Sequence, residues 1–192
     1  MLDKSIPYKH ILMKRPKGLP VEQHALPDGF SFVMYEAGLE HDWAEIETSV
    51  LEFDNIESAM QRLHKDYLPY ADELKRRMIF VQDPQGELIA TTTVWWYDTG
   101  ERRDTALHWV AVKPGFQGKG IGKAIFSEGM KRAIAIDGDV DLYLHTQTWS
   151  YPAINIYLKA GFEFLKTESI GGYENQYEEA MRLIGDKIIV KK

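Results

Sequence analysis

The segment from Leu107 to Phe126 constrains the fold most, because it joins a strand pattern to a helix pattern through a glycine-rich turn. Leu107 to Val112 is an apolar run that predicts a strand. Lys113-Pro114 ends this strand, since proline has no N–H to donate to a neighbour. Gly120 to Ile136 then shows the spacing of an amphipathic helix. We therefore expect a strand, a glycine loop and a helix in direct succession.

The loop between this strand and this helix is suited to bind an anion. It carries three glycines, Gly118, Gly120 and Gly122, at the start of the helix, where backbone N–H groups lack partners. The free N–H groups and the helix dipole favour negative charge, and the missing side chains let a phosphate approach. Lys119 and Lys123 add positive charge nearby. The loop is thus a candidate pyrophosphate site.

Two well-known nucleotide motifs do not fit the loop. A P-loop would continue from Gly115 to a Gly-Lys-Ser or Gly-Lys-Thr ending, but Gly120 is followed by Ile121 and Gly122. A dinucleotide fingerprint needs G-x-G-x-x-G, and Gly122 comes one residue too early for it. No βαβ repeat surrounds the loop either. The phosphate ligand is therefore of another kind.

The remaining patterns alternate between strands and helices. Strands are expected at 30–35, 78–81, 88–97, 105–112, 141–148 and 162–168, and helices at 43–53, 55–68, 71–77, 120–136 and 153–159. The tail, Glu178 to Val190, fits either a short helix or a final strand. In the first helix, apolar residues at helical spacing predict one buried face and one acidic face. This order favours a mixed α/β sheet over a doubly wound one.

The length of 192 residues suits a single domain with one core. Within it, Met1 to Pro27 holds four prolines around a short apolar run, which predicts an irregular arm or an edge strand. Residues 28–192 would then form the main body of this domain. We assign no chemistry to the N-terminal part.

Composition excludes several classes of function. There are 23 Lys and Arg against 29 Asp and Glu, and this net charge of −6 disfavours binding to nucleic acid or anionic membranes, whereas it suits a cationic amine. The absence of cysteine excludes disulfides, thiolate zinc sites and a cysteinyl intermediate. No leader and no apolar run of roughly 18 residues is present, which favours a cytoplasmic protein.

A metal site is not expected. The six histidines form no H-x-x-x-H or H-x-H pair. Asp137 to Asp141 resembles the start of a calcium loop, but the sixth position, which requires glycine, is Leu142. A helix end near Gly138 accounts for this segment better.

The run from Gln117 to Gly122, preceded by the apolar residues Val110, Ala111 and Val112, resembles the Q/R-x-x-G-x-G/A loop of the GNAT superfamily of N-acetyltransferases. The resemblance implies that the strand pairs its backbone with the pantetheine arm of acetyl-CoA and that the loop amides hold the pyrophosphate. The implied cofactor residues are Val110, Ala111, Val112, Gln117, Gly118, Lys119, Gly120, Ile121, Gly122 and Lys123. Glycines that serve only the turn are the alternative interpretation.

A second match lies at Tyr151 to Phe162, which resembles the A-x-x-L-Y-x-x-x-G-F helix and strand of the same family. It implies that Tyr157 protonates the departing CoA thiolate, a role that suits a phenol with an ordinary pKa of about 10. A partly buried aromatic without chemistry is the alternative. Ser150 stands where many members have an asparagine that contacts the cofactor, and Asn155 is out of register for that role.

The resemblance implies a GNAT-type, mostly antiparallel sheet flanked by helices in a single α/β domain. The implied reaction is direct transfer of an acetyl group from acetyl-CoA to a primary amine on a small molecule or peptide, without a covalent enzyme intermediate. His108 and His145 could serve as bases, but hydrogen-bonded sheet histidines are the expectation. A catalytically silent acyl-CoA sensor and a structural domain are rival hypotheses. A homodimer is compatible with the sequence, which does not fix the oligomeric state.

Overall fold

Seven strands form one sheet in the order β2-β3-β4-β5-β6-β1-β7 in the computed structural model, which describes residues 2–100 and 103–189. The strands are β1 His10–Arg15, β2 Ser31–Met34, β3 Met78–Gln82, β4 Leu88–Asp98, β5 Arg103–Val112, β6 Leu142–Gln147 and β7 Glu163–Phe164. The pairs β1–β6, β1–β7, β2–β3 and β3–β4 are antiparallel, and β5–β6 is parallel. This confirms the predicted α/β fold with a mixed, mostly antiparallel sheet.

The helices fall close to their predicted positions. They are α1 Glu40–Ser49, α2 Ile56–Asp66, α3 Ala71–Arg77, α4 Ile121–Asp137, α5 Tyr151–Lys159 and α6 Tyr177–Ile184, with short 3-10 turns η1 Leu68–Tyr70, η2 Pro114–Phe116, η3 Thr148–Ser150 and η4 Gly185–Lys187. The ambiguous tail is therefore helical over α6, while Val190, the last residue of that prediction, lies outside the described residues. Gly138 ends α4 with a φ of 84°, as expected for a helix end.

The described residues group into two compact units. Unit 1 comprises Gln23–Val94 and His108–Arg132, and unit 2 comprises Leu2–Glu22, Trp95–Leu107 and the chain from Ala133 onward. Strands β4 and β5 and helix α4 contribute residues to both. We describe each unit by itself.

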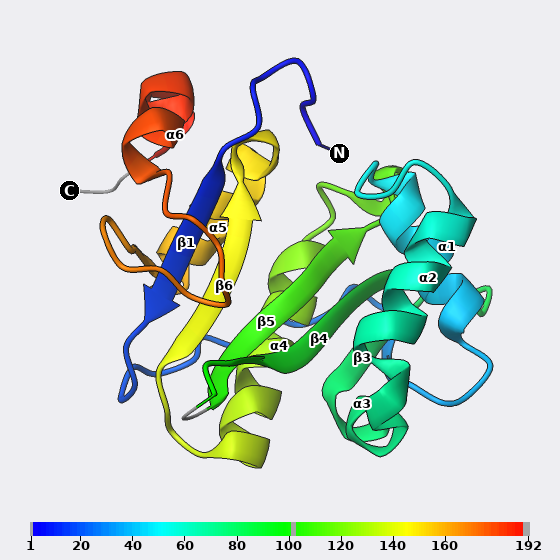
Figure 1. Cartoon of the computed structure of the whole chain (residues 1–192). Helices are drawn as coiled ribbons and strands as arrows, with labels where there is room; N and C mark the ends of the chain where they lie inside the picture. Colours follow the sequence, from blue (N-terminus) through cyan, green and yellow to red (C-terminus); the bar gives the residue numbers. More distant parts are fainter. Residues whose placement is uncertain (1, 101–102, 190–192) are drawn as a thin grey trace. The chain divides into compact units, whose positions relative to one another are not determined.

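Unit 1 buries apolar residues of β3, β4 and α4 against one another. Its cluster is formed by Val81, Ile89, Ala90, Ile121 and Ile125. Helices α1 and α2 lie side by side in the same unit (Figure 1). Asn55 caps α2, because its side-chain oxygen accepts a hydrogen bond from the Ser58 amide at 2.9 Å. The core thus fixes the start of α4, which follows the glycine loop.

Unit 2 contains β1, which pairs on both sides. Leu12 lies opposite His145 of β6, and Met13 lies opposite Phe164 of β7. Strands β1 and β6 run side by side (Figure 1). The prediction of an edge strand within residues 1–27 is therefore wrong in its position. The physical reason is that Ile11, Leu12 and Met13 are all buried, so both faces of β1 are covered, and the prolines lie outside the paired residues.

Arg15 ends β1 inside unit 2 and is only 1% exposed. Its Nε donates to the Ala160 carbonyl at 2.9 Å, and its Nη2 donates to the carbonyls of Leu19 and Pro20 at 2.8 and 2.9 Å. The guanidinium thereby joins the end of α5 to the chain that leaves β1. Such buried charges are stable only when hydrogen bonds replace the lost water.

The strand predicted at 162–168 is much shorter than expected. Strand β7 contains only Glu163 and Phe164, and after them the Leu165 amide still donates to the Leu12 carbonyl of β1 at 2.9 Å. The Asn175 side chain donates to the carbonyls of Leu165 and Glu168 at 2.9 and 2.7 Å, which holds the following loop. A side chain therefore replaces the strand partner that a longer β7 would have needed.

Candidate active site

Strand β5 and the turn after it carry the predicted cofactor residues of unit 1. Ala111 is 5% exposed, whereas Val110 and Val112 are half-buried. The Lys113 amide donates to the Ile89 carbonyl at 2.8 Å, which ends the strand. The Gln117 side chain donates to the Val112 carbonyl at 2.9 Å. Gln117 thus closes the turn and fixes the start of the loop.

The loop glycines take a backbone shape that other residues rarely adopt. Gly118 has a φ of 78° and Gly120 has a φ of 87°, both in the left-handed region. A Cβ added at either position would meet no atom within 4 Å. The glycines therefore serve the backbone conformation and leave open space beside the loop, where a ligand has room.

The loop leads directly into the first turn of α4. The first helical hydrogen bonds come from the amides of Lys123 and Ala124, which both donate to the Gly120 carbonyl at 3.1 Å. The N–H groups of Ile121 and Gly122 precede these bonds and belong to the open end of the helix. Because the Ile121 side chain is only 1% exposed, it anchors this end in the core of unit 1.

Positive charge near the loop comes from exposed lysines. Lys119 and Lys123 are both exposed, and the Lys119 ammonium lies 5.0 Å from the centre of the Phe116 ring. An oriented set of N–H groups with two mobile cations can hold a diphosphate. The predicted residues of this loop therefore lie together in unit 1.

Ser150 and Tyr157 belong to unit 2. The Tyr157 side chain is 7% exposed on α5, and its carbonyl accepts the Phe162 amide at 3.0 Å. Ser150 precedes α5 and makes no side-chain cap hydrogen bond. Asn155 donates to the Lys187 carbonyl at 3.2 Å and accepts from the Ile189 amide at 2.7 Å, so it holds the C-terminal segment. The catalytic role of Tyr157 and the cofactor role of Ser150 stay predictions.

His108 lies in a hydrogen-bonded group of unit 1. The hydroxyl of Tyr67 is 2.6 Å from Nδ1 of His108, and it accepts the indole N–H of Trp109 at 2.6 Å. A neutral His108 whose Nδ1 accepts the Tyr67 proton satisfies both contacts. The expectation of a hydrogen-bonded sheet histidine is confirmed. Its partner Tyr67 follows α2, 41 positions away, and no sequence pattern links the two.

A backbone irregularity brings these groups together. Trp109 has a φ of 54°, in the left-handed region, although it lies within β5. Successive side chains of a regular strand point to opposite faces, so His108 and Trp109 would not meet the same hydroxyl. The irregular φ allows both to contact Tyr67. Such strain in a non-glycine residue is common beside functional sites.

The surroundings of His108 keep its ring neutral. Burial, and to a smaller extent the nearby Arg62 guanidinium, lower the pKa of His108 to about 3. A base of this strength accepts protons poorly at neutral pH. His108 is therefore suited to orient Tyr67 and Trp109 at physiological pH.

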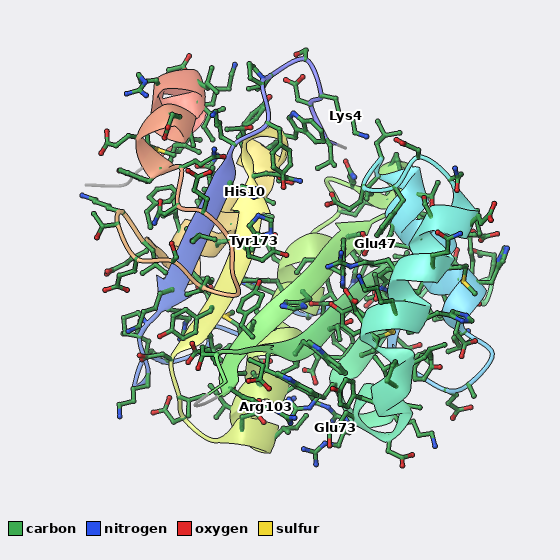
Figure 2. The ribbon with its side chains drawn as sticks, in the orientation of Figure 1. Lys4, His10, Glu47, Glu73, Arg103 and Tyr173 are labelled. Atoms are coloured by element: carbon green, nitrogen blue, oxygen red, sulfur yellow. The ribbon has the colours of Figure 1, made fainter. Side chains whose placement is uncertain are left out.

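The second predicted strand histidine, His145, has partners in unit 2. Its Nε2 lies 2.8 Å from Nδ1 of His10, and its ring stacks on Tyr173 with centres 3.8 Å apart. Figure 2 shows His10 and Tyr173 next to each other at β1 and β6. Burial lowers the pKa of His10. His145 is thus also a hydrogen-bonded sheet histidine, as expected.

Glu47 is a candidate residue that the sequence patterns did not identify. It was expected on the acidic face of the first helix, but it is only 2% exposed and lies on the inner side of α1 (Figure 2). Its Oε1 has no hydrogen-bond partner among residues 2–100 and 103–189. Glu47 stands one helical turn after the buried Trp43, and this i,i+4 spacing was the only available signal.

Two further observations concern metals and membranes. Within the part of the chain that the structure describes, no three histidine, aspartate or glutamate side chains gather closely enough to hold a metal ion. In that same part, no helix is both long and apolar enough to cross a bilayer.

Solved structures that resemble this chain include acetyltransferases. A GCN5-related N-acetyltransferase from Sphaerobacter thermophilus shares 17% identity with a TM-score of 0.61, over 83% of this chain and 49% of that one. A GNAT-family acetyltransferase from Colwellia psychrerythraea shares 15% identity with a TM-score of 0.60, over 82% and 54% of the two chains. A tandem GNAT protein from the clavulanic acid biosynthesis pathway shares 16% identity with a TM-score of 0.61, over 83% and 50%.

At these identities the likeness shows the fold alone, and the chain spans about half the length of these proteins. A search of curated proteins found no match. The sequence itself is more informative, because the family model described as "Acetyltransferase (GNAT) family" matches residues 40–162, well over half of the chain. This range contains β5, the glycine loop and α5. The chain therefore belongs to the GNAT family of acetyltransferases.

Proposed function

We propose that the protein transfers an acetyl group from acetyl-CoA directly to a primary amine. The observation that supports this most is the loop in which Gly118 and Gly120 have left-handed backbones with open space beside them. Family membership indicates acyl transfer, and a helix start with open glycines beside it supports binding of a pyrophosphate such as that of CoA. Residues 28–192 would form the acetyltransferase domain.

In the proposed reaction, the residues of unit 1 bind the cofactor. The backbone of Val110 to Val112 pairs with the pantetheine arm and polarises the acetyl carbonyl, and the loop from Gln117 to Gly122 holds the pyrophosphate with help from Lys123. Oriented N–H groups stabilise the charge that develops on the carbonyl oxygen when the amine attacks. The neutral amine forms the new C–N bond while the C–S bond breaks, CoA leaves as a thiolate, and the nitrogen gives up a proton to water.

Two residues of unit 2, Tyr157 and Ser150, have proposed roles in the same reaction. The phenol of Tyr157 donates its proton to the thiolate, and Ser150 contacts the cofactor. No enzyme-bound acyl intermediate is required, since the chain contains no cysteine and the amine attacks acetyl-CoA itself.

Calorimetric titration with acetyl-CoA tests the cofactor loop. Gly120→Glu places a carboxylate in the open space and should abolish binding, because it repels the pyrophosphate and strains the left-handed backbone. Gly138→Glu is a matched control, since Gly138 has a φ of 84° and equally open space at the other end of α4. Full binding by Gly120→Glu would refute the loop assignment.

Turnover of Tyr157→Phe tests the proton donor. We expect at least a tenfold lower kcat with acetyl-CoA affinity nearly unchanged, because only the leaving thiolate loses its acid. An unchanged kcat would remove Tyr157 from the mechanism. If the wild-type protein binds acetyl-CoA but releases no CoA with any amine, the rival hypothesis of a silent acyl-CoA sensor is favoured.

A further inference from the structure

We infer that the acceptor of this reaction carries an alkylammonium group and that the buried carboxylate of Glu47 recognises it. This inference rests on the proposed acetyl transfer and adds the chemical class of the acceptor. It concerns a site within unit 1, formed by α1, the loop after it and the irregular part of β5. The evidence comes from an unsatisfied charge, an aromatic surface and the distribution of charge along the chain.

Glu47 is buried without compensation. It is 2% exposed, and its Oε1 lacks a hydrogen-bond partner in the described residues. The charged neighbour that influences it is the carboxylate of Glu52, which is also negative. Burial, with a smaller contribution from Glu52, raises the pKa of Glu47 well above its ordinary value. In this setting the neutral acid is favoured, and a cation that binds beside Glu47 would stabilise its charged form.

Glu47 shares the buried face of α1 with Trp43, which belongs to a group of aromatic rings. Trp43, one turn before Glu47 on the buried face of α1, contacts Phe53 and Trp109 with ring centres 5.9 and 5.6 Å away. Phe53 and Trp109 lie 5.3 Å apart. We call these three residues the aromatic trio. The rings of Phe53 and Trp109 are half-buried, so the trio has an accessible side.

A cation already occupies the outer side of this surface. The guanidinium of Arg62 lies 5.9 Å from the centre of the Trp109 ring, while its Nε is 2.6 Å from Asp66. Aromatic faces attract cations through their negative π-surface, most strongly where water is excluded. On the side of the trio toward Glu47, the rings could therefore contact the apolar stem of an amine. The Glu47 carboxylate could pair with the ammonium group of that amine.

The stretch of sequence that contains α1 is strongly acidic up to Arg62. Residues 18–61 contain no Lys or Arg and ten acidic residues, so this stretch carries −10 while the rest of the chain carries +4. The stretch includes α1, the loop after it and the start of α2. Such a concentrated field attracts cations and repels anionic acceptors. A carboxylate-bearing acceptor such as a free amino acid fits this surface poorly.

The site also adjoins the proposed cofactor strand. Trp109 immediately precedes Val110, and the irregular φ of Trp109 directs its ring to the side of Tyr67. An amine held between Glu47 and the trio would thus lie along the same strand that pairs with acetyl-CoA in the proposed function. Substrate recognition and cofactor binding would then share β5.

The test compares three six-carbon compounds: hexylamine as a cation with an apolar stem, hexan-1-ol as its neutral analogue and aniline as a neutral amine. Binding is followed by the intrinsic fluorescence of the five tryptophans, of which Trp43 and Trp109 lie at the site, and turnover by CoA release. We expect hexylamine to bind at least tenfold more tightly than hexan-1-ol. Glu47→Gln should raise the Kd and KM for hexylamine tenfold or more and leave those for aniline nearly unchanged.

Glu57→Gln is the matched control, because it removes one carboxylate from the same acidic stretch at an exposed position of α2. It should change the hexylamine KM less than twofold. Equal losses in both variants would show a general field effect and overturn the inference, as would an unchanged KM in Glu47→Gln.

The outcomes separate this inference from the proposed function. Fluorescence binding of hexylamine does not require acetyl-CoA, so a protein that fails to bind acetyl-CoA still tests Glu47. If Glu47→Gln does not fold, Phe53→Leu provides a second test at a half-buried position, with an expected loss of hexylamine affinity of threefold or more. Unchanged affinity in that variant would overturn the role of the trio.

Discussion

Two fully buried ionisable side chains, Arg15 in unit 2 and Glu47 in unit 1, have opposite surroundings. Three backbone carbonyls accept hydrogen bonds from Arg15, at 2.8 to 2.9 Å. Glu47 has an oxygen without a partner among the described residues, and its charged neighbour is another glutamate. The hydrogen bonds of the free protein therefore already stabilise the charge of Arg15. The charged form of Glu47, by contrast, would be stabilised by a cation that binds beside it.

Neutral polar groups show a similar difference. In unit 2 the Thr148 hydroxyl donates to the Pro7 carbonyl at 2.7 Å and accepts from the Lys9 amide at 3.1 Å. In unit 1 the hydroxyls of Thr91, Thr92 and Thr93 are buried, and no described residue hydrogen-bonds to them. Since buried polar groups are normally satisfied, orphaned ones in one region indicate a place for ligand or water.

The largest expected effect is the loss of stability on replacing Arg15, whose charge is satisfied by hydrogen bonds. Arg15→Met should lower the free energy of unfolding by about 3–5 kcal/mol, because three carbonyls lose the donor that joins them within unit 2. Urea denaturation measures this loss. Arg182→Met, at an exposed position of α6, should change it by less than about 0.5 kcal/mol. Equal small changes in both variants would contradict the structural role of Arg15.

The parts of the molecule that the sequence predicted well are encoded locally. The strand, glycine loop and helix from Leu107 to Phe126 follow one another along the chain, and turn chemistry marks each boundary. The position of β1 was not predictable in this way, because its partners His145 and Phe164 are distant in sequence. An apolar run with flanking prolines is equally compatible with an edge and with an inner position.

Only those residues of the candidate site that belong to a sequence motif could be predicted from the sequence. Gly118 and Gly120 are recognisable by spacing, since their left-handed backbones require glycine. Tyr67 joins His108 through a contact between elements, and Glu47 is hidden because an acidic residue on an amphipathic helix is normally exposed. Whether a polar side chain is buried depends on the elements that pack over it. The spacing of apolar residues along one helix does not show which elements these are.

The second prediction concerns acid stability and His108. Its folded pKa of about 3 lies below the ordinary value of 6.5, so the unfolded chain binds a proton that the folded chain does not. Stability should therefore fall as the pH drops below 6.5, by about 2 kcal/mol at pH 5.

Denaturation of His108→Gln between pH 5 and 8 measures this contribution. In His108→Gln, the slope of the unfolding free energy against pH should largely disappear. His64→Gln, at an exposed position of α2, should keep the wild-type slope. A wild-type slope in His108→Gln would show that His108 is not buried as a neutral ring in solution.

The third prediction concerns Glu47, whose contribution to stability changes with pH in the opposite direction to that of His108. Because burial raises the folded pKa of Glu47 above its ordinary value of 4.5, the folded chain holds a proton that the unfolded chain releases. Stability from this group is lost as the pH rises from about 4.5 through the folded pKa, by at most about 1.4 kcal/mol per pH unit. Glu47→Gln should therefore be more stable than the wild type at pH 8 in the absence of amine. Saturating hexylamine should narrow this difference, and a variant that is less stable at pH 8 would mean that Glu47 has a cationic partner in the free protein.

The smallest expected effect compares two hydroxyls. Thr148→Val should destabilise the protein by roughly 1 kcal/mol, because the Pro7 carbonyl and the Lys9 amide both lose their partner. Thr92→Val removes a buried hydroxyl without a partner among the described residues, so its unfolding free energy should change by no more than about 0.5 kcal/mol or rise. Urea denaturation of both variants at one pH decides this. A loss in Thr92→Val as large as that in Thr148→Val would mean that water already satisfies the threonines of unit 1 in the free protein, and the contrast between the units would then rest on Arg15 and Glu47 alone.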